Sequence, residues 1–109
     1  MRLTELEPIF LRVAERGERA VFKHVSTIEE AHGLRFLCPK CYQANGGPKG
    51  THSVICWTPQ APLDDKSAGG ARWPMSGTGY LDLTLTPSIQ LLGGCHWHGF
   101  ITNGEATSV

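Results

Sequence analysis

The sequence has no excess of charge of either sign. Its 109 residues contain 10 basic and 10 acidic side chains, so the formal net charge is zero. Domains that bind nucleic acid through phosphate attraction are usually strongly basic. The balance therefore argues against nucleic acid as the main partner, although a small nucleic-acid-binding domain stays open as an alternative.

Long apolar runs are also missing. No segment approaches the roughly 20 apolar residues that a membrane span requires, so we expect no membrane partner. Residues 1–8 contain acids and a proline where a signal peptide would have an apolar run. We therefore expect a cytoplasmic protein, in which paired cysteines are ligands rather than disulfides.

The length and the spacing of turn residues predict one β-rich domain over residues 1–109, without internal repeats. A capping-box pattern, Ser26 to Glu29, predicts one short helix that ends at Gly33. In the strand predicted over 80–86, the alternating leucines Leu81, Leu83 and Leu85 are expected to face the core. Residues 58–72 are predicted to form a mobile loop. The remaining strands are predicted at 9–13, 20–25, 34–37, 51–57, 88–92 and 97–102, with a turn at 103–104.

Two short motifs with matched spacing predict a metal site. Cys38 and Cys41 form a C-x2-C motif, and Cys95 and His98 form a C-x2-H motif. Tetrahedral zinc takes four such ligands, and two tight turns can each present a pair. Together with the strand pattern, this predicts an elaborated zinc-ribbon-like antiparallel sheet with one short helix, and Zn²⁺ as the cofactor.

A redox pair is the alternative explanation for the C-x2-C motif. Such a pair sits at the start of a helix, whereas residues 42–50 contain three glycines and a proline. Four good ligands leave no open position on a zinc ion, so we expect a structural site and assign no catalytic residue. A small zinc-dependent hydrolase or transferase that uses His52 near the metal remains an alternative.

Other residues stand out around the proposed site. His52 and His96 are candidates for hydrogen bonding to the ligands or for a functional role. Cys56 is expected in the core. Arg72 and Trp73 are candidates for an interface with a protein partner, because exposed Arg and Trp often anchor interfaces.

Four segments carry a resemblance to a known family, at residues 36–41, 50–57, 72–79 and 94–100, and the first eight residues extend it. They resemble a family of small phage- and prophage-encoded proteins of unestablished function, often labelled ammonia monooxygenase. The resemblance implies a phage or prophage origin, a host-cell cytoplasmic location and the ligand set given above. It does not imply copper chemistry, because three cysteines and a histidine suit zinc. From the sequence we therefore expect a zinc-stabilised module that acts through protein contacts, with a host factor as one candidate partner.

Overall fold

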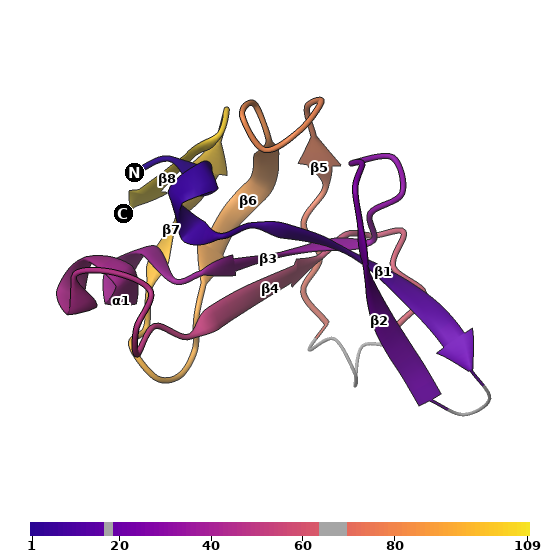
Figure 1. The fold of residues 1–109 in the computed structure, drawn as a ribbon, viewed down its shortest axis with the longest axis horizontal. Coiled ribbons are helices and arrows are strands. Elements are labelled where there is room, and N and C mark those ends of the chain that lie inside the picture. Colours follow the sequence, from indigo (N-terminus) through magenta and orange to yellow (C-terminus); the bar gives the residue numbers. More distant parts are fainter. Residues whose placement is uncertain (17–18, 64–69) are drawn as a thin grey trace.

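The chain folds into two antiparallel sheets of four strands each, with one short α-helix (Figure 1). The computed structural model describes residues 1–16, 19–63 and 70–109. The sheets have the strand orders β2-β1-β3-β4 and β5-β6-β7-β8. The prediction of a mostly β protein with one short helix is confirmed. The elements are η1 (Leu3–Leu6), β1 (Ile9–Arg16), β2 (Arg19–Val25), β3 (Gly33–Leu37), α1 (Pro39–Asn45), β4 (Ser53–Trp57), β5 (Met75–Ser76), β6 (Thr84–Gln90), β7 (His98–Thr102) and β8 (Glu105–Ser108).

The first sheet has β1 and β3 at its centre and β2 and β4 at its edges. Strand β1 pairs with β2 along its whole length and with β3 only at its start, where Phe10 lies opposite Leu34. Strand β4 is the last strand of this sheet, with Val54 opposite Phe36. The predicted hairpin of the first 25 residues is confirmed, and residues 17 and 18 of its turn lie outside the described residues.

The second sheet ends in a hairpin whose turn is visible in the sequence. Asn103 and Gly104 both have positive φ, 49° and 76°, as a two-residue hairpin turn requires. The turn places Thr102 opposite Glu105. Strand β6 contains Pro87, and its pairing with β7 shifts register around that residue, where a strand proline is tolerated.

The two sheets share one hydrophobic core. Strands β3 and β4 contribute Leu34, Phe36 and Cys56, and Trp97 packs edge-on against Phe36 with ring centroids 6.0 Å apart. Figure 1 shows β6 running across the direction of β3 and β4, which is one of the two common ways for sheets to pack. No helix in the described part of the chain is long and apolar enough to cross a membrane.

The α-helix lies elsewhere than the sequence predicted. Residues 26–32 form bends and turns, and the Thr27 hydroxyl donates to the Glu30 carboxylate. The helix is instead α1, which has Pro39 at its first position and Gly46 at its end with φ 72°. Proline at the start and glycine just past the end are strong helix boundaries, and the sequence analysis did not use them.

The predicted strand over 80–86 is wrong in its first half. Strand β6 begins only at Thr84, and the side chain of Leu81 is 70% exposed. The Asp82 carboxylate accepts the backbone N–H groups of Thr78 and Gly79 at 2.9 and 3.0 Å. These bonds close a local turn, so the leucine alternation becomes a strand only after residue 83.

Candidate functional site

Three cysteines and one histidine converge where the two sheets meet. Cys38 precedes α1, Cys41 lies in its first turn, His52 precedes β4, and Cys95 lies in the loop between β6 and β7. Their sulfur and ring nitrogen atoms all lie within 4.8 Å of one another. The pairing of β3 with β4 explains part of this arrangement, because the Cys38 N–H donates to the His52 carbonyl at 2.9 Å.

The distances within this cluster fit a tetrahedral metal ion. The Cys38 and Cys95 sulfurs are 3.5 Å apart, and His52 Nε2 lies 3.4 Å from the Cys95 sulfur. With metal–sulfur bonds of about 2.3 Å and metal–nitrogen bonds of about 2.0 Å, ligand atoms lie roughly 3.5 to 3.8 Å apart. All four cysteines of the chain are free thiols, so the donor set fits a metal ion.

The thiols of the cluster differ in acidity. Burial, together with the neighbouring Cys95 thiol, raises the pKa of Cys38 to about 12. Burial also raises the pKa of Cys41. Burial acts in the same direction on Cys95, but hydrogen bonds from His52, the Trp97 backbone and the two other thiols outweigh it and lower its pKa to about 6. Near neutral pH, the cluster therefore holds one thiolate, and a bound cation would favour release of the other two protons.

The fourth member of this cluster is His52, where the C-x2-H spacing predicted His98. His98 is the first residue of β7 and lies opposite Gln90 of β6. That pairing directs its ring to the Ser88 hydroxyl, with Nε2 3.2 Å from Oγ. The C-x2-H spacing therefore does not bring His98 to the cluster, because strand β7 begins at this residue and its pairing sets the direction of the ring.

The other residues that the sequence singled out have separate places. His96 has a positive φ of 56° and is exposed, outside the cluster. Cys56 is fully buried in the core, as expected. The Arg72 guanidinium donates to the Leu63 carbonyl at 2.8 Å, and the half-buried Trp73 donates from its indole to the Ser88 carbonyl at 3.2 Å. Their predicted role at an interface stays a prediction.

The α1 helix starts at the first cysteine, which removes one argument against a redox pair. Cys38 is its N-cap residue, and Cys41 lies one turn further. Cys95 and His52 nevertheless lie within the same few ångströms as the two helical thiols. A donor set of four groups from three parts of the chain is typical of a metal site.

A second pair of polar side chains, Ser88 and His98, lies on β6 and β7. Both side chains are half-buried. The distance of 3.2 Å between Oγ and Nε2 is within the range for a nucleophile and its base. The sequence analysis missed Ser88, because no short motif surrounds it and the partner histidine lies ten residues further along the chain.

The metal cluster and the serine–histidine pair share one loop. Residues 91–97 connect Ser88 on β6 with His98 on β7, and Cys95 lies within them. The loop is closed by the Leu91 N–H, which donates to the Trp97 carbonyl at 2.9 Å. A metal bound at Cys95 would therefore hold the loop that joins the two strands.

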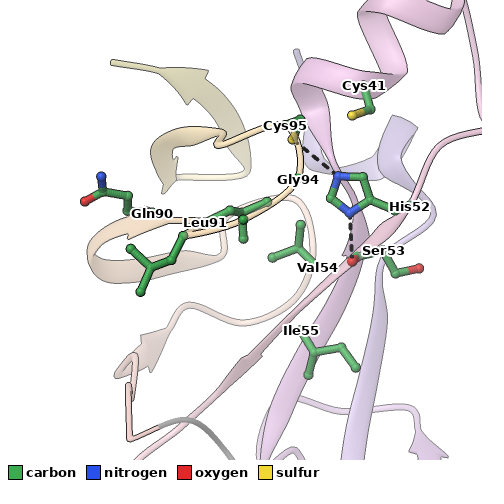
Figure 2. Close-up of a pocket in the computed structure, with 11 residues that line it drawn as sticks. Cys41, His52, Ser53, Val54, Ile55, Gln90, Leu91, Gly94 and Cys95 are labelled. Carbon is green, nitrogen blue, oxygen red and sulfur yellow. Dashed lines mark hydrogen bonds between the residues drawn. The ribbon is translucent and has the colours of Figure 1, made fainter.

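A pocket of about 470 Å³ lies beside the cluster, between β4 and residues 90–95. Figure 2 shows the His52 ring between Cys95 and the carbonyl group of Ser53, at the upper end of this pocket. Its lining contains no Asp, Glu, Lys or Arg, and its titratable side chains are His52, Cys41 and Cys95 of the cluster.

Over residues 11–109 the sequence matches the family described as the bacterial ubiquitination-like system serine protease, BubE. The match covers most of the chain, so this protein belongs to the BubE family. Comparison with curated proteins and with solved structures gives no match. The resemblance to phage-encoded proteins is not tested by these findings and stays a prediction.

Proposed function

We propose that this protein is a serine protease of a bacterial ubiquitination-like system, with Ser88 as nucleophile and His98 as general base. One observation carries the proposal. Among the described residues, Ser88 is the one serine whose hydroxyl lies within hydrogen-bond distance of a histidine ring. The family match supports the same chemistry, because a serine protease needs an activated serine hydroxyl.

The pair can carry out both halves of peptide hydrolysis. His98 Nε2 takes the hydroxyl proton as Ser88 Oγ attacks the peptide carbonyl carbon, and it then gives this proton to the leaving amine. The acyl group remains on Oγ as an ester. Water then attacks the ester with His98 again as base, which releases the acid and restores the hydroxyl.

The main chain around the pair is held firmly. The Ser88 carbonyl accepts the Trp73 indole N–H at 3.2 Å, and the His98 carbonyl accepts the Val109 N–H at 2.9 Å. In the part of the chain that is described, no carboxylate hydrogen-bonds to His98, so the proposed machinery is a dyad. Packing and sheet pairing would then orient the imidazole.

We propose zinc as the ion of the cysteine and histidine cluster, in a structural role. Three thiolates and one imidazole form a donor set that zinc favours, and four ligands leave no position for a reacting water. The ion would tie α1 and the start of β4 to the loop that carries Cys95. The free thiols also favour a reducing compartment, so we place the protein in the bacterial cytoplasm.

Two functions expected from the sequence, a protein-interaction module and a nucleic-acid-binding ribbon, stay predictions. The hydrolase alternative that used His52 near the metal is replaced here by a hydrolase that uses Ser88. The reason is geometric, because the ring nitrogen of His52 lies within the donor cluster and a bound metal would occupy it.

Hydrolysis of a panel of internally quenched peptides tests the proposal. We expect Ser88→Ala and His98→Ala to lower kcat/KM by about a thousandfold or more, as for the dyad members of other serine proteases. Ser26→Ala is the matched control, since this exposed serine lies in a bend far along the chain from the pair. Activity that survives in both dyad variants, with zinc content unchanged, would contradict the proposal.

A further inference from the structure

Strand β4 offers a free backbone edge. It is the outermost strand of its sheet, and its N–H and C=O groups alternate between β3 and the open side. The His52 carbonyl accepts the Cys38 N–H on the β3 side, whereas the Trp57 carbonyl accepts the Trp73 N–H on the open side. By this alternation, the N–H and C=O groups of Ile55 face the open side.

Strand β6 offers a second free edge. The Leu91 N–H donates to the Trp97 carbonyl of the β7 side, whereas the Ser88 carbonyl accepts the Trp73 indole on the opposite side. By the same alternation, the backbone groups of Gln90 face away from β7. Strand β5 leaves this part of the edge open, because it pairs only with Thr84 and Leu85.

These two edges form opposite walls of the pocket beside the metal cluster. Ile55 of β4 lies on one wall, and Gln90 begins the other (Figure 2). Apolar side chains are exposed there, 40% for Ile55 and 87% for Leu92. The volume of about 470 Å³ lies in the range of ligand-binding pockets.

We infer that this groove binds the substrate as an extended peptide segment, which lies between the free edges of β4 and β6. This inference rests on the proposed protease function. Unpaired strand edges bind extended peptides through main-chain hydrogen bonds. Gln90 is two residues from Ser88, a distance of about 7 Å along a strand, so a peptide paired with Gln90 lies along the strand that carries the proposed nucleophile.

Peptide binding to the Ser88→Ala protein tests the groove without cleavage. The probe is a fluorescent octapeptide of alternating valine and serine with blocked ends, measured by fluorescence anisotropy. Methylation of its backbone nitrogens should weaken binding about tenfold or more, because it removes the main-chain donors.

A pair of variants at Ile55 provides the matched control. Ile55→Pro removes one outward N–H group, which an edge strand tolerates, and should lower affinity about fivefold. Ile55→Val keeps this N–H and should stay within about twofold of the parent protein. The methylated peptides test the same hydrogen bonds even if the proline variant does not fold.

Equal affinity for methylated and parent peptides, or no binding of the parent peptide at millimolar concentration, overturns the inference. Ser88-dependent hydrolysis without binding in the groove would leave the protease proposal standing and overturn the groove alone. Methylation-sensitive binding in a protein whose Ser88 is inert would support the groove and contradict the protease proposal.

Discussion

At the scale of single residues, two histidines have separate chemical environments. His52 Nε2 lies 3.4 Å from the Cys95 sulfur, and His98 Nε2 lies 3.2 Å from the Ser88 hydroxyl. An imidazole nitrogen that binds a metal cannot take a proton from a serine, because both uses need the same lone pair. In the proposed function, the two rings therefore serve two sites, one for a metal and one for proton transfer.

Paired substitutions separate these two roles. We expect His52→Ala to weaken zinc binding about tenfold to a hundredfold, as loss of a ligand or its support commonly does. His98→Ala should keep one zinc per chain and lose hydrolysis. Elemental analysis and a chelator competition measure the metal. If His98→Ala lost zinc and His52→Ala kept it, the result would contradict this assignment and support His98 as the fourth ligand.

The acidity of the thiols predicts how zinc affinity depends on pH. Cys38, with a pKa of about 12, and Cys41, with a raised pKa, must each lose a proton to bind the metal. Cys95, with a pKa of about 6, has already lost its proton near pH 7.5. Zinc affinity should therefore rise with pH, by about a hundredfold per pH unit between pH 7 and 8. A competition titration that gives the same affinity at both pH values would contradict this assignment.

The three cysteines of the cluster could be predicted from their spacing, but the two histidines could not be assigned in the same way. His52 reaches the cluster because the register of β3 and β4 brings it beside Cys38. His98 is turned to Ser88 by the register of β6 and β7. Register is set by pairing across the whole sheet, and a short motif carries no information about it.

At the scale of elements, the loop of residues 91–97 joins the two proposed sites. It carries Cys95, and the Lys40 ammonium donates to the Cys95 carbonyl at 2.7 Å. The loop emerges from β6 two residues after Ser88 and leads directly into β7 at His98. The loop therefore connects the two proposed catalytic residues along the chain, while the pairing of β6 with β7 holds them side by side.

Metal removal should loosen this loop. We expect faster hydrogen exchange over residues 91–97 after chelation, because Cys95 loses its bond to the rest of the cluster. The β1–β2 hairpin contributes no member of the cluster and serves as the internal control. Unchanged exchange over 91–97 after verified metal removal would show that the metal does not hold the loop.

Gly99 allows β7 and β8 to pair beside a tryptophan. A Cβ atom at this position would meet the Thr107 carbonyl and the Trp97 ring, whereas one at Gly93 would meet nothing within 4 Å. We expect Gly99→Ala to lower the free energy of unfolding by about 1 to 3 kcal/mol, through overpacking. Gly93→Ala should change it by less than about 0.5 kcal/mol. Denaturant unfolding of both variants measures the difference, and equal stability would contradict this packing.

Element prediction succeeded where the signal was local. The Asn103–Gly104 turn and the alternation of residues 9 to 13 both correspond to observed hairpins. It failed at residues 26–33, where a capping box was followed by too short a segment to form a helix, and at Pro39 to Gly46, where the boundary residues were not recognised. It also failed at Leu81, where backbone N–H groups donate to the Asp82 carboxylate and close a turn. The alternation of leucines does not predict this turn.

At the scale of the whole molecule, the metal cluster links the two sheets. Cys38, Cys41 and His52 follow or precede strands of the first sheet, and Cys95 belongs to a loop of the second. The shared core makes the same link through Phe36 and Trp97. A small domain buries limited apolar surface, so an ion bound at the junction would add substantially to its stability.

Strong chelation should therefore unfold the protein or lower its Tm substantially. A structural zinc site contributes about 10 kcal/mol or more of apparent binding free energy, comparable with the total stability of a domain of about 5 to 15 kcal/mol. Circular dichroism and thermal melting before and after metal removal measure the effect. An unchanged Tm in metal-free protein would show that the core alone holds the sheets together.

The central claim is that Ser88 is a nucleophile activated by His98, and a fluorophosphonate probe tests it most directly. The probe forms a covalent bond with activated serines, and tandem mass spectrometry then locates the adduct. The account predicts one adduct, on Ser88, which disappears in His98→Ala although that variant keeps its zinc. An adduct on another serine, or an adduct on Ser88 that forms equally fast without His98, would contradict the account.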